Sequence, residues 1–255
     1  MPELPDLQLF SRNLHQKLAG LQLNEIDVPV SGKLNVPKST LEKAIVGHTL
    51  KSVKRDGKTL HFIFDNGHTL QLHLMLNGEL VLGEETPKHT IISFRFSDGS
   101  KVSLTDFRKM ANATLDPEPS NAPDALEVDA EFFEALLGTK KTAIKNILLD
   151  QQLIRGIGNA YADEILWQAR ISPFSKADQI PKAKIKELSK AVTTVLQDAE
   201  KQLIKSHPDI ISGEIRDFLK IHGAKIKESP TGAPVLMKKT GSRKTYYTDE
   251  QTLFE

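Results

Sequence analysis

The first residues of the chain, MPELPDL, offer a nitrogen suited to covalent chemistry. A methionine that precedes proline is normally removed because the next side chain is small, and its removal exposes the secondary amine of Pro2. An α-amino group has a pKa of roughly 8, so part of such an amine is unprotonated at neutral pH. It can attack a carbonyl-like carbon to give an iminium, with Glu3 adjacent as a proton donor or acceptor. Taken alone, the same letters also fit a disordered start.

A second pattern, LLDQQLIRGIGNAYADE, occupies residues 148–164. Gly156 and Gly158 predict a tight turn, and Asn159 is a natural N-cap for a helix that follows. Backbone N–H groups at such a helix start can hold a phosphate oxygen. An ordinary capped core helix is the alternative interpretation of this pattern by itself.

A helix is predicted directly after the N-terminal proline, over residues 5–18. Apolar residues recur there at helical spacing, and Pro5 suits the first turn. Asp6 complements the positive end of the helix, and Gly20 follows as a stop. The positive end of this helix disfavours protonation of an amine just ahead of it.

Alternating apolar residues predict two β-hairpins after this helix. The first pairs positions 60–64 with 70–76 across an Asp-Asn-Gly turn, and the second pairs 92–96 with 102–104 across Ser-Asp-Gly. The first part of the chain is therefore predicted to be a helix followed by an antiparallel sandwich or barrel.

A change of composition predicts a domain boundary. The segment DPEPSNAP at 116–123 holds three prolines, which cannot continue a helix or a sheet. Beyond it the apolar spacing predicts helices over 130–137, 142–150, 160–169 and 182–205. After Phe218 the regularity fails, and a tail rich in Gly and Pro ends in a strand-like TYYT.

Composition narrows the class of protein. A chain of 255 residues can form one large or two ordinary domains. The absence of cysteine excludes disulfides, thiol catalysis and every cysteine-based zinc site. No stretch approaches the roughly 18 apolar residues of a membrane span, and no secretory signal is visible.

The net charge of only +1 conceals local basic clusters. Between positions 225 and 247 six bases face one acid, Glu228, and a second basic cluster lies at 140–145. Charge runs of this kind are also typical of a solvated surface, so composition by itself does not assign a function.

Together, the two motifs resemble the Fpg/Nei family of base-excision DNA glycosylases. The second motif is similar to the helix–two-turn–helix of that family. Ribosomal and topoisomerase-type proteins share this helical element, but they leave MPELPDL unexplained. The resemblance runs from Pro2 to about Gln251, nearly the whole chain.

The resemblance implies an α+β fold with four parts. An N-terminal helix and an antiparallel β-sandwich form the catalytic domain over 1–116, and a linker follows at 117–123. A helix–two-turn–helix DNA-binding domain spans 124–222, and a β-hairpin finger without zinc spans 223–255.

The resemblance also implies an activity, a bifunctional DNA glycosylase and AP lyase that excises oxidised bases and nicks abasic sites. The implied partner is damaged double-stranded DNA, bound by a monomer that needs no metal, no small-molecule cofactor and no membrane. The implied location is the cytoplasm, with association to the nucleoid of a prokaryotic cell. A non-catalytic paralogue that binds damaged or distorted DNA is the alternative.

Three residues match the catalytic positions of the family. Pro2 matches its Schiff-base nucleophile, Glu3 matches the partner acid that helps open the deoxyribose, and Lys58 matches a hairpin lysine near the lesion phosphate. Asp6 stands where the family usually has glutamate, so it keeps the charge but loses reach.

Other residues match positions that contact DNA. Leu76 and Met110 replace a methionine and a phenylalanine that fill the gap left by the extruded base, and both remain apolar. Arg108 matches the arginine that faces the orphaned partner base. The remaining matches to DNA contacts are His89, Lys140, Asn159 and Arg243.

The tail departs most from the family pattern. Val235, Lys238, Thr248 and Gln251 occupy the four cysteine positions of the family's zinc finger. Structural zinc contributes on the order of 10 kcal/mol in small finger peptides, so packing of the hairpin must replace it. The segment from Phe218 to Pro234 is also too short for the long base-capping loop of the branch directed at 8-oxoguanine.

Overall fold

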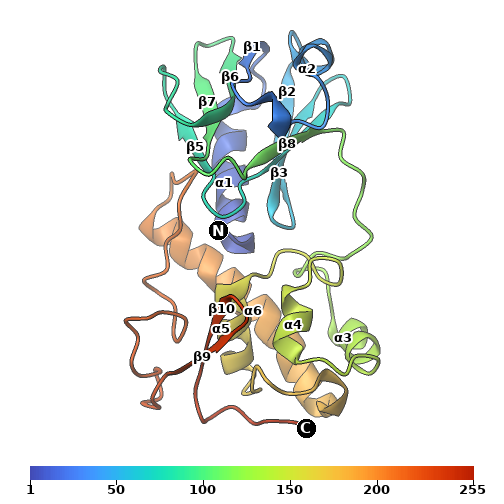
Figure 1. The fold of residues 1–255 in the computed structure, drawn as a ribbon, viewed down its shortest axis with the longest axis vertical. Helices are drawn as coiled ribbons and strands as arrows, with labels where there is room; N and C mark the ends of the chain where they lie inside the picture. The colour runs from blue at the N-terminus through green and yellow to red at the C-terminus, as the bar shows by residue number, and fades with distance from the viewer. The chain divides into compact units, whose positions relative to one another are not determined.

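The computed structural model describes residues 1–255, which divide into two compact units. The first contains Met1–Pro119 and Leu203–Glu214, and the second contains Ser120–Gln202 and Ile215–Glu255. Figure 1 labels the elements of each unit. None of the helices combines the length and apolar character that a membrane-spanning segment requires.

The first unit is a sandwich of two four-stranded antiparallel sheets accompanied by helices (Figure 1). One sheet has the order β1 (Leu23–Asp27), β6 (Thr90–Phe96), β7 (Lys101–Thr105) and β5 (Glu79–Leu82). The other has the order β2 (Leu50–Asp56), β3 (Thr59–Phe64), β4 (Thr69–His73) and β8 (Asn112–Leu115). The helical segments of this unit are α1 (Leu4–Leu18), η1 (Ser31–Lys33) and α2 (Lys38–Ile45).

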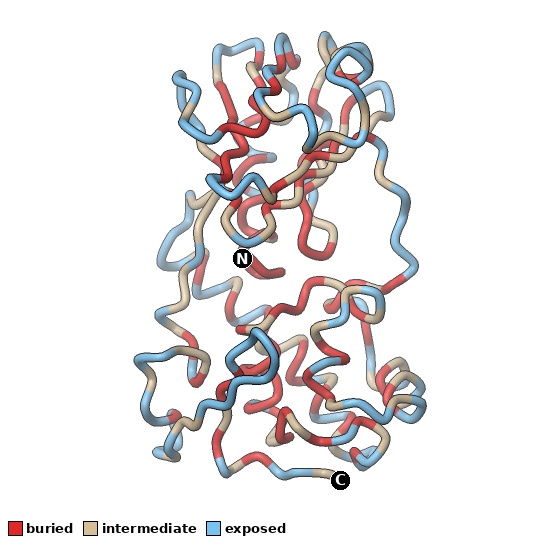
Figure 2. The backbone as a smooth tube through the Cα atoms, viewed as in Figure 1, coloured by how far each residue is buried: buried red, intermediate tan, exposed pale blue.

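Alternating apolar residues of the strands form the core of this unit. Phe62 of β3 and Phe94 of β6 stack with ring centroids 5.9 Å apart, which joins the two sheets. Phe10 and Leu14 of α1 belong to the same buried cluster. Figure 2 shows the buried backbone following the strands and α1. Each such side chain contributes about 1.5–3 kcal/mol when it is fully buried.

Residues 207–214, which follow helix α6 (Lys182–Ser206), are hydrogen-bonded to the first unit. The Asn13 amide of α1 donates to the carbonyls of Pro208 and Ile210 at 2.8 and 2.7 Å. The Leu80 backbone N–H donates to the Ser212 hydroxyl at 2.9 Å. These bonds hold residues 207–214 beside α1 and β5.

The second unit is helical with one β-hairpin. Its elements are α3 (Ala130–Leu137), α4 (Ile144–Leu149), α5 (Asn159–Gln168), η2 (Ala177–Gln179), α6 (Lys182–Ser206, assigned to this unit as far as Gln202), β9 (Leu236–Thr240) and β10 (Arg243–Tyr247). The four helices predicted from apolar spacing are therefore all present, with ends that differ by at most two residues.

Candidate functional site

The chain start is built into the first turn of α1. Glu3 is the N-cap, and its carboxylate accepts the backbone N–H of Asp6. In return the Asp6 carboxylate accepts the Glu3 N–H at 2.8 Å. This reciprocal pair satisfies two backbone donors that a helix start otherwise leaves open. The shorter Asp6 therefore closes the capping box at the start of α1, directly after Pro2 and Glu3.

Pro2 lines a small cavity at this end of the sandwich. The cavity measures about 210 Å³, and its other walls are residues 76–79 and the pair Gly213 and Glu214. The Met1 ammonium forms an ion pair with Glu214. An acid therefore lies beside the first backbone nitrogen of the chain, next to the predicted nucleophile.

Lys58 lies in the turn between β2 and β3 and is only 9 % exposed. Strand register aligns Leu60 with Leu72, which carries this turn toward His73 of β4. Burial lowers the pKa of His73, and the positive charge of Lys58 lowers it further. Arg55 donates to Gln8 of α1 at 2.7 Å, which ties the hairpin to the helix.

Strand register also brings two further loops together. Glu79 pairs with Thr105, and His73 pairs with Asn112. The residues that flank the loop 74–78 are therefore paired with the residues that flank the loop 106–111, so the two loops lie next to each other. Leu76, Arg108 and Met110 come from these two loops.

The alternation predicted as far as Leu76 was wrong at its end. The strand β4 stops at His73, since Met75 adopts a left-handed φ of 54° and the Gly78 N–H closes a turn onto the Leu74 carbonyl at 2.8 Å. A Cβ on Gly78 would lie 2.2 Å from that carbonyl oxygen, so only glycine fits. The turn leaves Leu76 51 % exposed at the tip of the loop.

Asp106 organises the neighbouring loop, and the sequence patterns did not single it out. Its buried carboxylate accepts backbone N–H groups from Arg108, Met110 and Ala111, each at 2.8 Å. Its own N–H donates to the carbonyl of His89 at 2.9 Å. Burial by itself would raise the pKa of Asp106, but these three donors and the Arg108 charge bring it below the ordinary value.

Three of the five non-glycine residues with positive φ lie at the same end of the sandwich, and the other two, Asp116 and Arg170, lie elsewhere. Non-glycine residues with positive φ include Met75 at 54°, His89 at 62° and Lys109 at 54°. Such conformations persist only where surrounding contacts impose them, and they cluster at functional sites. Here the contacts are those of Asp106 and of the turn that ends at Gly78.

We expect Asp106→Asn to lower the stability of the first unit by about 2–3 kcal/mol, because the amide NH₂ would face backbone donors. Asp98→Asn is the matched control, since Asp98 accepts the Ser100 N–H at 2.8 Å in an exposed turn. The low pKa of Asp106 means that the wild type keeps this stabilisation at neutral pH. The wild type loses this stabilisation as the pH falls below about 4 and Asp106 becomes protonated, whereas the stability of the variant does not change for this reason. Thermal melts across pH would check this, and equal melting temperatures for the two variants would contradict it.

In the second unit, the sequence predicted Asn159 to be the N-cap of α5. That prediction was wrong, because Asn159 is the first residue of the helix. The N-cap is Gly158, in an extended conformation, and Gly156 makes the turn with a φ of 103°. The Asn159 amide instead donates to the carbonyl of Lys244 at 2.9 Å. It thereby contacts the finger one residue beyond Arg243, which is exposed at the start of β10. Lys140 is half-buried between α3 and α4.

A buried ionic cluster fixes the finger hairpin to α4 and α5. Asp163 is fully buried, and its carboxylate contacts Lys145 Nζ at 2.6 Å and His222 Nδ1 at 2.7 Å. The same carboxylate accepts the Tyr246 N–H at 2.9 Å, and Lys145 donates to the Thr245 hydroxyl at 2.8 Å. Asp163 belongs to the motif GIGNAYADE, although the sequence patterns gave it no role.

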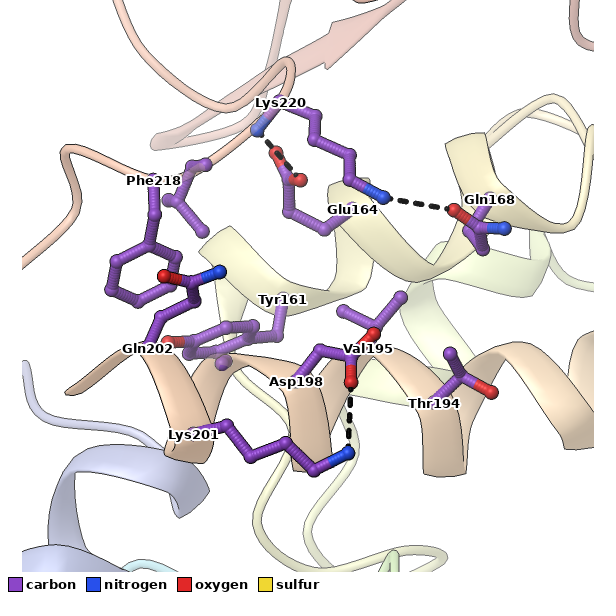
Figure 3. Close-up of a pocket in the computed structure, with 12 residues that line it drawn as sticks. Tyr161, Glu164, Gln168, Thr194, Val195, Asp198, Lys201, Gln202, Phe218 and Lys220 are labelled. Atoms are coloured by element: carbon purple, nitrogen blue, oxygen red, sulfur yellow. Dashed lines mark hydrogen bonds and ion pairs between the residues drawn. The ribbon is translucent and has the colours of Figure 1, made fainter. Parts of the chain in front are cut away.

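The next residue, Glu164, holds the chain that precedes the finger. Its carboxylate accepts three backbone N–H groups, from Lys220, Ile221 and His222, at 2.8–2.9 Å. Burial raises the pKa of this carboxyl even though the three donors oppose the shift. Figure 3 shows Glu164 in the wall of a cavity of about 330 Å³ formed by α5, α6 and residues 218–220. Lys220 also donates to Gln168 there at 3.2 Å.

Two of the residues at the family's cysteine positions are buried and hydrogen-bonded. The Gln251 carbonyl oxygen accepts the Thr248 N–H at 2.8 Å, and its amide donates to the Ile171 carbonyl at 2.8 Å. Thr248 donates to Glu250 at 3.1 Å. Hydrogen bonds from Thr231 above all, and from Trp167, Arg170 and Thr248, lower the pKa of Glu250 to about 2. At the other two positions, Val235 is half-buried and Lys238 is exposed.

The residues selected from the sequence therefore form two groups. The first unit carries Pro2, Glu3, Lys58, Leu76, His89, Arg108 and Met110, and the second unit carries Lys140, Asn159 and Arg243. No group of three or more His, Asp or Glu residues is arranged to hold a metal ion. The first group contains the buried Pro2, an acid, a lysine and two apolar residues, of which Leu76 is exposed and Met110 is half-buried.

Comparison with known proteins supports the resemblance drawn from the motifs. Residues 1–113 match the formamidopyrimidine-DNA glycosylase N-terminal domain, and residues 115–207 match the H2TH domain of the same enzyme. A formamidopyrimidine-DNA glycosylase of Pelotomaculum thermopropionicum is 31% identical, with 97% of each chain covered. Another from Mycoplasma mobile is 29% identical at the same coverage.

A solved structure has the same fold. The Lactococcus lactis Fpg, determined in complex with DNA that contains an abasic site, superposes with a TM-score of 0.89 at 25% identity. The match covers 98% of this chain and 100% of that one. The predicted α+β fold, with its N-terminal helix, antiparallel sandwich and helix–two-turn–helix, is confirmed. The chain belongs to the formamidopyrimidine-DNA glycosylase family.

Proposed function

We propose that the protein is a DNA glycosylase of base-excision repair with an associated AP lyase activity, acting on damaged double-stranded DNA. The observation that carries the proposal is the N-terminal arrangement. Pro2 lines a cavity beside two acids, Glu3 and Glu214, at the end of the sandwich where the loops of Leu76 and Arg108 meet. Membership of a glycosylase family supports the same chemistry.

The proposed reaction begins when the damaged nucleotide leaves the helix and the unprotonated Pro2 nitrogen attacks its C1′. The glycosidic bond between C1′ and the base nitrogen breaks, the base departs with the bonding electron pair, and the Pro2 nitrogen passes its N–H proton to the departing base. A proton supplied at the sugar ring oxygen, for which Glu3 is the adjacent acid, opens the deoxyribose to an iminium. Loss of a C2′ proton then expels the 3′ phosphate and nicks the strand, and water releases Pro2 for the next cycle.

Lys58 is proposed to hold a phosphate next to the lesion. It suits this task because it is nearly buried, so its charge is weakly screened, and because its hairpin is tied to α1. Phosphate contacts position the DNA without reading its sequence. The other proposed contacts are His89, Lys140, Asn159 and Arg243.

The four predicted parts of the chain have matching proposed tasks. The sandwich of 1–116 carries the chemistry, and the helix–two-turn–helix of 124–222, which follows the linker at 117–123, binds the DNA backbone. The finger of 223–255 presents Arg243 without zinc, supported by the Asp163 cluster and the Gln251 hydrogen bonds. No metal or cofactor takes part in the proposed reaction, and the active form is a monomer.

We expect oxidised pyrimidines, ring-opened or hydantoin-type lesions and plain abasic sites to be processed faster than 8-oxoguanine opposite cytosine. Glu164 already fixes residues 220–222, so little chain remains before the finger to close over a flipped purine. An uncapped purine loses base-edge hydrogen bonds, each bidentate pair contributing roughly 1–3 kcal/mol. Single-turnover rates on a panel of lesion duplexes, followed by base release and by strand nicking, test both the function and this preference. A clear lead for 8-oxoguanine opposite cytosine would contradict the preference, and no release or nicking on any duplex would contradict the function.

A further inference from the structure

Phe107 is the most exposed large apolar residue of the chain, with 59 % of its surface accessible. It is the second residue of the loop 106–111, directly after Asp106. Leu76, 51 % exposed, lies in the adjacent loop, so the ring is part of a group of exposed apolar side chains at this end of the sandwich, and such groups indicate an interaction site.

The backbone around Phe107 is held on both sides. Asp106 accepts the N–H groups of Arg108 and Met110, and the Lys109 N–H closes the turn onto the Asp106 carbonyl at 3.0 Å. The exposure of Phe107 is therefore a product of the hydrogen bonds of the loop. A ring presented on a fixed loop loses little conformational freedom when it binds.

The surroundings of the ring combine apolar and cationic groups. The Arg108 guanidinium carbon lies 5.4 Å from the centroid of the Phe107 ring. Leu76, also exposed, lies at the tip of the adjacent loop, and Lys109 is an exposed cation. An aromatic face flanked by cations suits a nucleobase and its phosphates.

We propose that Phe107 stacks on a base that borders the gap left by an extruded nucleotide in damaged duplex DNA. The inference rests on the proposed function, since it needs a nucleotide that leaves the helix. It differs from the sequence-based expectation, which gave the plug to Met110 together with Leu76. Met110 is half-buried and lacks a π-face, whereas Phe107 presents its ring to solvent and has one. Inserted side chains of this kind replace the stacking that an extruded base removes.

Binding measurements test the proposal with alanine variants. For a duplex with a tetrahydrofuran abasic analogue, we expect Phe107→Ala to raise Kd about tenfold and Met110→Ala to raise it less. Leu82→Ala is the matched control, because Leu82 is an exposed apolar residue at the opposite end of β5 and should leave Kd unchanged. On an undamaged duplex of the same sequence all three variants should bind like the wild type. An unchanged Kd for Phe107→Ala, or an equal loss on both duplexes, would overturn the proposal.

A fluorescence measurement checks the stacking directly. The chain has a single tryptophan, Trp167, which is 5 % exposed, so a second tryptophan in the loop gives a readable signal. Emission from Phe107→Trp should be strongly quenched by the abasic duplex, and emission from Met110→Trp should change less. Stronger quenching of Met110→Trp than of Phe107→Trp would show that Met110, not Phe107, stacks on the base. If wild-type protein does not prefer the abasic duplex to the undamaged one, the proposed function fails and not the stacking role alone.

Discussion

Borohydride will trap the wild-type protein covalently on abasic DNA, and Pro2→Gly will reduce the rate of trapping by about 100-fold. With Met1 removed, the amine of Pro2 is secondary, so its adduct with an aldehyde carbon is a charged iminium that borohydride reduces. Glycine keeps an amine but loses the pyrrolidine ring that lines the cavity, and its freer backbone lets the nitrogen shift from its position. Misplacement of a reacting atom by about 1 Å is enough for a loss of this size. Trapped complex measured by gel shift against time gives the rate.

Pro5→Ala is the matched control for this experiment. Pro5 lies in the first turn of α1, three residues further on, and has no place in the proposed reaction. Its variant should trap within about twofold of the wild type. If Pro2→Gly is trapped as fast as the wild type, the nucleophile is a different residue, such as Lys58.

The state of Met1 has to be measured in the same preparation, because the Met1 ammonium pairs with Glu214 and a retained methionine blocks the amine of Pro2. The mass of the N-terminal peptide decides this. A correctly processed wild type that binds abasic DNA but gives no covalent adduct would favour the alternative of a non-catalytic paralogue.

Local patterns predicted the elements because each pattern has one physical cause. Alternation in β3 and β4 reflects one buried face, and the proline-rich segment at 116–123 marks where regular structure stops. The end of β4 was mispredicted because Leu76 continues the alternation in sequence. The turn closed by Gly78 overrides that pattern, and its hydrogen bond is invisible to hydrophobic periodicity.

The residues that hold the site were harder to find than those proposed to act. Asp106, Asp163 and Glu164 carry no periodic signal, since their partners are backbone N–H groups and side chains brought near by folding. An aspartate two residues before Arg108, in a loop that must turn sharply, is the one local signal available. Asn159 was misplaced by one residue for a similar reason. Its amide bonds to Lys244, 85 positions away, so Gly158 is left to cap the helix.

The finger provides the second large effect: Asp163→Ala should destabilise the second unit by about 3–5 kcal/mol. The substitution leaves Lys145 and His222 without their carboxylate partner in a buried site, and the cost of an unpaired buried charge is of this size. The Tyr246 N–H loses its acceptor as well, so β10 should separate from α5. We expect a lower melting temperature together with weaker binding to DNA, because Arg243 begins the same strand.

Two controls separate this cluster from a general effect of lost charge. Asp198→Ala removes an exposed partner of Lys201 at 3.2 Å in the same unit, and surface pairs of this kind contribute little. Combining Asp163→Asn with Lys145→Met removes both charges and should recover part of the stability, because an uncharged pair leaves no buried ion uncompensated. If the cluster anchors the finger, this double variant should also regain DNA affinity. The slope of log Kd against log salt should then return toward the wild-type value, as expected if Arg243 makes the proposed phosphate contact. Melting temperatures of Asp163→Ala and Asp198→Ala that coincide would show that the hairpin is held by other contacts.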